Sequence, residues 1–526
     1  MGSAVSRRRT FAIISHPDAG KTTLTEKLLL YGGAIHEAGS VKSRKAARAA
    51  TSDWMELERK RGISITSSVL QFEHEGIRYN LLDTPGHQDF SEDTYRTLTA
   101  ADCAIMLIDA AKGVEAQTRK LFQVCRMRGT PIVTFVNKLD RPSRDPFELM
   151  RELEEVLGIA TVPRTWPIGS GDLFQGVYDI ESQTVMRFAL GKDGAAKCAD
   201  VSVAGIEDPQ LEALIGERAR GELKDEIELL TGAGETFDRA RFLAGEITPV
   251  FFGSALTNFG VEPFLHVFRD LAPPPAPRKS ADGNVIDPEG EGFSGFVFKV
   301  QANMDPSHRD RIAFLRICSG SFEGGMRVFH RRLGKEIRLN RAESFFAQDR
   351  AAVVEGVAGD IVGLYDPGLF RIGDTLSSDP NLAFTEVPRF SPEHFGRLRL
   401  LDPLKRKQIQ KGIEQLSEEG TVQLFTQSGR EKDPICGVVG QLQFEVLMYR
   451  LEHEYGARVA LDKLPYNTAR WVVGAENAKA LEARRLPLAV SDQDDHPVAL
   501  FRDEWEVGRA ARDNAEWTFL ETAPLK

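Results

Sequence analysis

A short loop between an apolar strand and a helix constrains this chain more than any other feature. Residues Thr10–Ile14 are almost all apolar and predict a buried strand. The segment Thr22–Tyr31 predicts a helix that ends at Gly32-Gly33. Strand, loop and helix in this order form the context of a phosphate-binding loop, because backbone N–H groups at a helix N-terminus attract anions.

The residue types in this loop fit a nucleoside triphosphate with Mg²⁺. Gly20 lets the backbone approach the phosphates, Lys21 can reach the β and γ oxygens, and the Thr22 hydroxyl can bind the metal. The first position is serine where the general pattern has glycine. The predicted loop consists of Ser15, His16, Pro17, Asp18, Ala19, Gly20, Lys21 and Thr22.

Apolar strands alternate with amphipathic helices through the first half of the chain. Runs at 104–108, 132–136 and 248–252 are candidate buried strands, and the alternation between 63 and 81 predicts a hairpin that ends at Asp83. Alternating strands and helices predict an α/β P-loop domain with a doubly wound, mostly parallel sheet.

Changes in the pattern of apolar residues, glycines and prolines predict three domains. The first spans 1–275, carries an inserted subdomain at about 160–245, and ends at the proline-rich linker 273–277. Short alternating runs broken by glycines predict a β-barrel domain at 290–385. Helical spacing returns in 390–526, which predicts an α+β C-terminal domain.

A second motif follows the predicted hairpin. It comprises Asp83, Thr84, Pro85 and Gly86. The carboxylate can reach the magnesium shell, and Gly86 can move toward the γ-phosphate. About two such D-x-x-G strings are expected by chance in a chain of this length, so the motif gains its weight from its place after the strand.

A third motif predicts the choice of base. It comprises Asn137, Lys138, Leu139 and Asp140, directly after the strand at 132–136. Guanine presents two donors on one edge, which a single carboxylate at Asp140 can accept, whereas adenine presents an acceptor there. A last segment, Ser254, Ala255 and Leu256, follows the strand at 248–252 and could offer backbone N–H groups to the guanine O6.

Bulk properties limit the function classes. The net charge of −10 excludes a general polyanion binder, although the basic run Lys405–Lys407 with Lys411 could be a nucleic-acid contact or a solvated face. Five scattered cysteines without a CxxC pair argue against a disulfide framework or a zinc site. With no apolar leader and no run of transmembrane length, we expect a cytoplasmic protein that does not enter a membrane.

Two segments resemble the switches of translational GTPases. Asp53–Ile65 is similar to their first switch, and Asp83–His87 is similar to their second. The resemblance implies that the Ser64 hydroxyl, where threonine is commoner, is a ligand of Mg²⁺ in the GTP-bound form. It also implies that His87 is the catalytic residue that positions the attacking water.

Longer stretches resemble the bacterial peptide chain release factor 3 family, within the elongation factor class. They include residues 15–22, 52–56, 89–96, 247–253, 301–306, 309–311, 373–375 and 416–420. The resemblance implies a monomeric, ribosome-stimulated GTPase that uses GTP/GDP and Mg²⁺. It also implies contacts with ribosomal RNA and proteins, and a role in removing class I peptide chain release factors at translation termination.

Three other functions remain open from the residues alone. An elongation or ribosome-protection GTPase would usually continue into further domains beyond the third. A nucleotide-gated binding protein would order a partner surface with negligible hydrolysis, which His87 opposes. An ATP-dependent P-loop enzyme would require Asp140 to be incidental.

Overall fold

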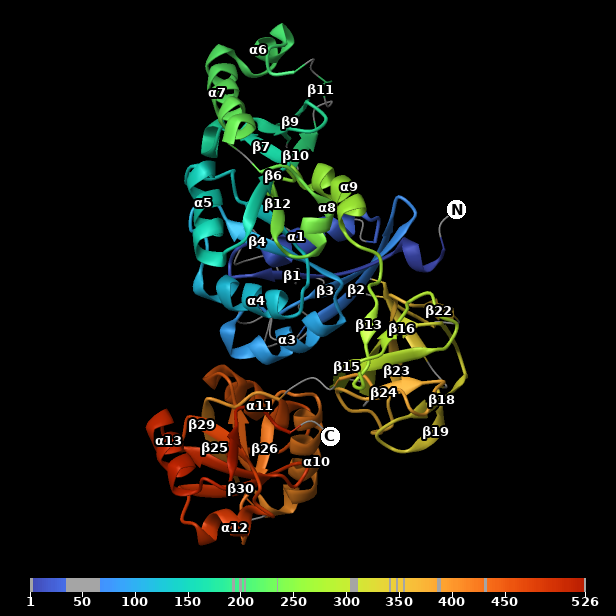
Figure 1. Cartoon of the computed structure of the whole chain (residues 1–526), viewed down its shortest axis with the longest axis vertical. Coiled ribbons are helices and arrows are strands. Elements are labelled where there is room, and N and C mark those ends of the chain that lie inside the picture. Colours follow the sequence, from blue (N-terminus) through green and yellow to red (C-terminus); the bar gives the residue numbers. More distant parts are fainter. Residues whose placement is uncertain are drawn as a thin grey trace. The chain divides into compact units, whose positions relative to one another are not determined.

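The computed structural model divides the chain into two compact units (Figure 1). The first comprises Met1–His87, Ala100–Ala276 and Phe345–Ala351, and the second comprises Gln88–Thr99, Pro277–Ser344 and Ala352–Lys526. The structure describes residues 3–524 apart from 35–66, 192–193, 198–200, 203–204, 234, 303–310, 340–341, 347–348, 353–354, 386–388 and 430–432. Among the helices within these ranges, none combines the length and apolarity needed to cross a membrane.

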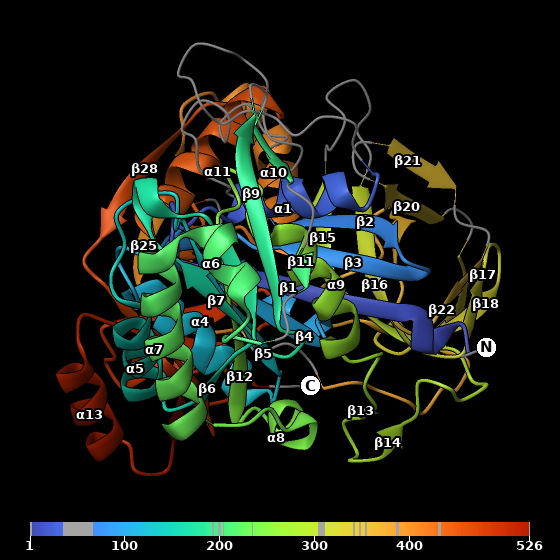
Figure 2. The ribbon, with the colours of Figure 1, turned by 90° about the horizontal axis from the view of Figure 1, so that it is seen from above.

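A twisted sheet forms the centre of the first unit. Its strands follow the order β2-β3-β1-β4-β5-β12-β6, and every neighbouring pair is parallel except β2 with β3. Figure 2 shows β1, β2 and β3 side by side. The strands are β1 (Arg8–Ser15), β2 (Ser68–His74), β3 (Ile77–Asp83), β4 (Cys103–Asp109), β5 (Ile132–Asn137), β6 (Ala160–Pro163) and β12 (Ile247–Phe252).

Helices pack on this sheet through apolar faces. Phe11 of β1 lies in one buried cluster with Leu24 and Leu28 of α1 and with Phe264 and Phe268 of α9. Phe11 and Phe268 make an edge-to-face contact with ring centroids 4.9 Å apart, a favoured aromatic geometry. The helices of the sheet are α1 (Lys21–Tyr31), α4 (Ala116–Met127), α5 (Pro146–Leu157) and α9 (Val261–Leu271). The predicted doubly wound, mostly parallel sheet is confirmed.

An additional subdomain separates β6 from β12. Trp166 of its first strand is fully buried, and its indole N–H donates to the Glu226 carboxylate of α7 over 2.7 Å, which ties strand to helix. Its elements are β7 (Thr165–Ile168), β8 (Gly176–Asp179), β9 (Thr184–Gly191), β10 (Gly194–Lys197), β11 (Val201–Ser202), α6 (Pro209–Ile215), α7 (Glu217–Ala233) and α8 (Arg239–Leu243).

The second unit contains the predicted β-barrel domain. Alternate side chains of its long strands, such as Val297 and Leu315, are buried in one apolar cluster with Phe322 and Leu376. The principal strands are β15 (Ser294–Ala302), β16 (Arg311–Ser319), β17 (Ser321–Glu323), β18 (Arg327–His330), β19 (Lys335–Arg338), β22 (Glu355–Val357), β23 (Ile361–Tyr365) and β24 (Thr375–Ser377). The short segments η2 (Gln88–Phe90) and α3 (Ser91–Ala100) are also grouped with this unit up to Thr99.

An α+β domain completes the second unit. Its antiparallel sheet has the order β28-β25-β27-β26-β30-β31-β29-β32. These strands are β25 (His394–Leu400), β26 (Gln423–Thr426), β27 (Ile435–Val438), β28 (Val459–Leu464), β29 (Thr468–Val473), β30 (Leu488–Asp492), β31 (Pro497–Phe501) and β32 (Thr518–Leu520), with helices α10 (Arg406–Glu418), α11 (Gln441–His453), α12 (Ala478–Ala483) and α13 (Glu504–Asp513). The predicted fold class is confirmed in all three parts, whereas the predicted domain bounds stay a prediction.

A buried arginine in α11 provides the first testable prediction. The Arg450 guanidinium lies 2.6 Å from a Glu419 carboxylate oxygen and 2.7 Å from one of Glu454, and its side chain is only 2% exposed. Replacing Arg450 with methionine should lower the free energy of unfolding by about 3–5 kcal/mol, because one buried and one partly buried carboxylate lose their ion pair with this arginine. Urea denaturation measures this loss. The matched variant Arg458→Met, which removes an exposed pair with Glu452, should cost less than about 1 kcal/mol, and equal losses would contradict the prediction.

Candidate nucleotide-binding site

The predicted phosphate loop joins β1 to α1, at the carboxyl end of a central parallel strand. The backbone of Asp18 and Gly20 has positive φ values of 67° and 101°. Leu24 N–H donates to the Gly20 carbonyl over 2.9 Å, so the helical hydrogen bonds begin at the loop. Such a turn leaves the first N–H groups of a helix without helical acceptors, which suits an anion.

Asn137 connects this loop to the last predicted segment. Its side-chain N–H donates to the Ala19 carbonyl over 2.8 Å, and its side-chain oxygen accepts from the Ala255 N–H at 2.8 Å. A Cβ on Gly20 would lie 2.4 Å from the Asn137 Nδ2. The close approach therefore requires glycine, and the buried amide holds three distant segments together.

Lys138 occupies the left-handed region with φ of 73° and bridges two acceptors. Its ammonium donates to the Asp18 carbonyl and lies 2.8 Å from the Asp109 carboxylate at the end of β4. Burial alone would raise the pKa of Asp109, but the hydrogen bonds from Lys138 and the Ala111 N–H lower this pKa below its usual value. Asp109 therefore remains ionised and keeps Lys138 in place.

Asp140 lies at an open pocket beside the loop. The Ser254 hydroxyl donates to one Asp140 carboxylate oxygen over 2.6 Å and accepts from the Thr257 N–H at 3.3 Å. This orients the carboxylate while its side chain stays 18% exposed. The pocket is lined by Asp18, Thr23, Asn137, Lys138, Asp140, Arg141 and Leu256.

The second motif packs against the phosphate loop. The Thr84 hydroxyl donates to the Ile13 carbonyl over 2.6 Å, and a Cβ on Gly86 would lie 3.6 Å from the Pro17 Cα. Lys21 and Asp83 form a buried ion pair, with side chains 7% and 2% exposed. A cation and a carboxylate thus face each other where the phosphate loop meets the end of β3.

Every predicted site residue except Ser64 lies within the described part of the chain. It brings together the phosphate loop, the second motif, the base motif and the segment 254–256 at the carboxyl ends of β1, β3, β5 and β12. Thr22, Pro85 and Leu139 belong to these same segments, and His87 is half-buried just after the second motif. Ser64 lies outside the described residues, so its predicted role stays a prediction.

Sequence reasoning missed two carboxylates at this edge of the sheet. Asp109 ends β4 and anchors Lys138, and Glu115 lies 3.1 Å from the His16 Nε2 of the phosphate loop. Asp109 could have been found, because it follows a buried strand whose carboxyl end must lie beside that of β1 in a parallel sheet. Glu115 lies six residues further along, and nothing local in the sequence indicates its partner.

Comparisons with known proteins define the class. Residues 6–274 match the family model described as the elongation factor Tu GTP binding domain, and residues 292–379 match elongation factor G domain 2. A crystal structure of a Thermus thermophilus protein has the same fold, with a TM-score of 0.68 over 88% of this chain and 69% of that chain at 23% identity. The chain is a translational GTPase, which binds a guanine nucleotide and hydrolyses GTP.

The C-terminal part and whole-chain relatives identify the family. Residues 384–511 match the model described as the C-terminal domain of the class II release factor RF3. Relatives named peptide chain release factor 3 include those of Symbiobacterium thermophilum (58% identical, covering 100% of this chain and 99% of the relative), Gloeobacter violaceus (55%, 100% and 99%) and Rippkaea orientalis (53%, 99% and 97%). The chain belongs to the peptide chain release factor 3 family.

Proposed function

We propose that this protein is a ribosome-stimulated GTPase of translation termination that promotes the departure of class I peptide chain release factors. The observation that carries the proposal is identity of 53–58% along essentially the whole chain to proteins named peptide chain release factor 3. The match at 384–511 to a release factor C-terminal domain supports it further. The ribosome, with its RNA and proteins, is the proposed partner, and the cytoplasm is the proposed location. We expect a monomer.

The site residues receive separate roles in this proposal. The loop Ser15–Thr22 holds the phosphates, with Lys21 at the β and γ oxygens, and Asp140 accepts the two donors of guanine. The Ser15 hydroxyl is buried without a hydrogen-bond partner among the described residues, as expected for a group whose partner is a ligand. The segment 254–256 supports the base through its backbone and through the Ser254 hydroxyl on Asp140.

The donor set also fits Mg²⁺. The Thr22 hydroxyl and the Asp83 carboxylate are hard oxygen donors, the kind that Mg²⁺ prefers, and Ser64 adds a hydroxyl by resemblance. When bound, the ion neutralises charge on the phosphate oxygens during hydrolysis. Lys21 and Asp83 contact each other directly. We therefore expect the phosphates to compete with Asp83 for the Lys21 ammonium, and Mg²⁺ to compete with Lys21 for the Asp83 carboxylate.

The proposed mechanism is a population shift. With GTP and Mg²⁺ bound, the segment around Gly86 and His87 would be fixed in position, which would favour one arrangement of the ribosome. If a class I factor binds another arrangement better, its affinity must fall by linkage. Hydrolysis then restores the initial state.

Release of a labelled class I factor tests the biological role. On purified termination complexes, this protein with GTP should accelerate departure of a fluorescent class I factor by at least about tenfold. A tenfold change equals about 1.4 kcal/mol, which lies within the coupling of about 1–3 kcal/mol typical between linked sites. The same protein with GDP is the control and should give a much smaller effect. An unchanged departure rate, together with stimulated movement of messenger and transfer RNA, would reassign the protein to the elongation class.

A further inference from the structure

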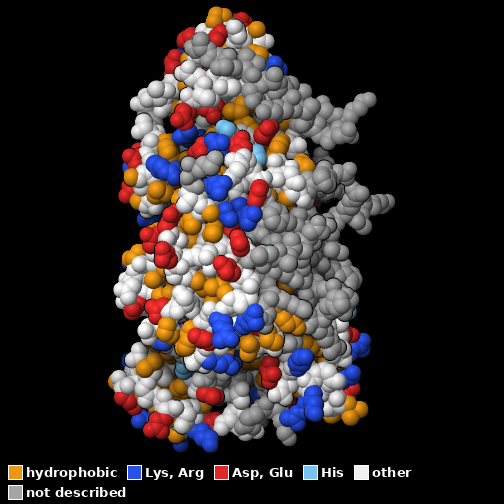
Figure 3. Space-filling view, turned by 90° about the vertical axis from the view of Figure 1, so that its right-hand side faces the viewer, with side chains coloured by type: hydrophobic (Ala, Val, Ile, Leu, Met, Phe, Trp, Pro, Cys, Tyr) orange, Lys and Arg blue, Asp and Glu red, His pale blue; other side chains and the backbone are white. Residues whose placement is uncertain are grey.

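A basic run begins helix α10 of the C-terminal domain. Residues 403–413 include four cations and no carboxylate, in a chain whose net charge is −10. The face shown in Figure 3 carries both basic and acidic side chains, and several basic side chains lie close together in the lower half of the view. A segment with four cations and no carboxylate is a local exception to the acidic balance of the chain.

These cations lack acidic partners within the described part of the chain. Arg406, Lys407 and Lys411 are exposed and Lys405 is half-buried. No carboxylate of the described residues forms an ion pair with any of the four, whereas buried arginines of the same domain, such as Arg450, hold two. Their charges thus face solvent and are available to a partner.

The position of the run on the helix makes it unfavourable for the isolated protein. Asp402 accepts from the Leu404 N–H over 2.9 Å and begins the short turn that leads into α10. Cations in the first turns lie at the positive end of the helix dipole, where carboxylates are preferred. An external anion would offset this repulsion, because both the positive end of the helix dipole and the cationic side chains would attract it.

Two leucines beside the run are unusually exposed. Leu401 is 58% and Leu404 is 89% exposed, so large apolar side chains flank the cations. The cations extend from residue 405 to 411, about 9 Å at about 1.5 Å per residue. This length suits an extended polyanion better than a single ion.

We propose that Leu401, Leu404, Lys405, Arg406, Lys407 and Lys411, the α10 patch, bind the phosphate backbone of a ribosomal RNA helix. The cations would contact phosphates, and the leucines would lie against riboses in the wide, shallow minor groove. The patch has no aromatic side chain on which unpaired bases could stack, which favours duplex over single-stranded RNA. That the RNA is ribosomal rests on the proposed function, whereas the binding of duplex RNA phosphates by the patch does not.

Salt-dependent binding of a fluorescein-labelled RNA hairpin to the full chain tests the proposal. The variant Lys405→Gln/Arg406→Gln/Lys407→Gln/Lys411→Gln should make the slope of log K against log salt less negative by about 3.6, because four phosphate contacts on a duplex are lost. The affinity of the wild type should thus fall about 150-fold more between about 50 and 200 mM salt than that of the variant. The variant Leu401→Ser/Leu404→Ser should weaken binding without changing the slope.

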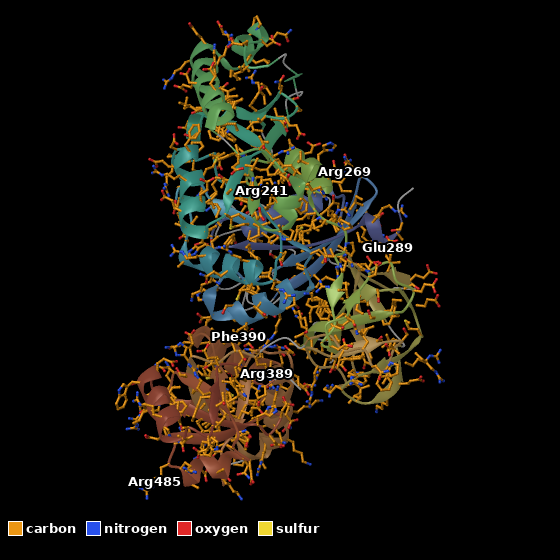
Figure 4. All side chains as sticks on the ribbon, viewed as in Figure 1. Arg241, Arg269, Glu289, Arg389, Phe390 and Arg485 are labelled. Carbon is orange, nitrogen blue, oxygen red and sulfur yellow. The ribbon has the colours of Figure 1, made fainter. Side chains whose placement is uncertain are left out.

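A control with the same change in charge comes from the same domain. Lys479, Arg485, Arg502 and Arg512 are exposed and unpaired among the described residues but are dispersed, and Arg485 lies at the periphery of the domain, just after α12 (Figure 4). Their replacement by four glutamines should leave the slope within about 1 of the wild type.

An equal loss of hairpin affinity in both variants, or wild-type hairpin binding by the α10 variant, would overturn the proposal. Normal hairpin binding with weakened ribosome binding would assign the patch to a ribosomal protein instead. Failed factor release with intact hairpin binding counts against the proposed function alone.

Discussion

Replacing Asp140 with asparagine should change the preferred base from guanine to xanthine. The carboxylate can accept both donors of the guanine edge, whereas an amide N–H can donate to the C2 carbonyl of xanthine. A site built to pair with a polar edge rejects the wrong base by about 10⁴- to 10⁵-fold, since a mismatch leaves buried groups unpaired. We therefore expect GTP affinity to fall by about that factor and xanthosine triphosphate to become the better ligand.

Competition against a labelled guanine nucleotide measures this change. Ser254→Ala is the informative companion, because it removes the 2.6 Å hydrogen bond that orients the Asp140 carboxylate but leaves both acceptor oxygens. It should lower affinity only about tenfold, equal to one hydrogen bond of roughly 1.4 kcal/mol. ATP displacing the label from the wild-type protein as well as GTP does would refute the assignment of Asp140.

The parts of the site that the sequence predicted are contiguous motifs at strand ends. Gly20-Lys21-Thr22 and Asn137–Asp140 each follow an apolar run, and in a parallel sheet such runs end at one edge. Local pattern and chain order were therefore enough to predict that these segments meet. The alternation of apolar strands and helices likewise predicted the doubly wound sheet.

The contacts that join the motifs could not be predicted in this way. Asp140 and Ser254 are separated by 114 residues along the chain, and the insert β7–α8 lies between them. The sequence suggested only backbone N–H groups at 254–256, yet the Ser254 hydroxyl donates to the Asp140 carboxylate and orients it. The hydrogen bond from Lys138 to Asp109 likewise depends on the distance between two loops. The hydrophobic periodicity of the sequence does not predict that distance.

Removing the His87 imidazole should abolish most turnover while leaving nucleotide affinity intact. His87 is half-buried and follows Gly86, which packs beside Pro17 of the phosphate loop. A group that positions the attacking water typically contributes about 10²- to 10⁴-fold to the rate. His87→Ala should therefore lower ribosome-stimulated single-turnover hydrolysis by about 10³-fold, with GTP and GDP affinities within about twofold of the wild type.

The first departure of a class I factor gives this prediction a second readout. His87 is the last residue of the first unit before the segment 88–99, which groups with the second unit. Because the variant keeps the γ-phosphate contacts, it should remain in its GTP-bound form on the ribosome and still accelerate the first departure of a class I factor. The exposed His266, hydrogen-bonded to Glu75 at 3.2 Å, supplies the control, and His266→Ala should hydrolyse GTP normally. Parallel loss of affinity and turnover in His87→Ala would make this histidine structural, and loss of the first departure would separate its role from water positioning.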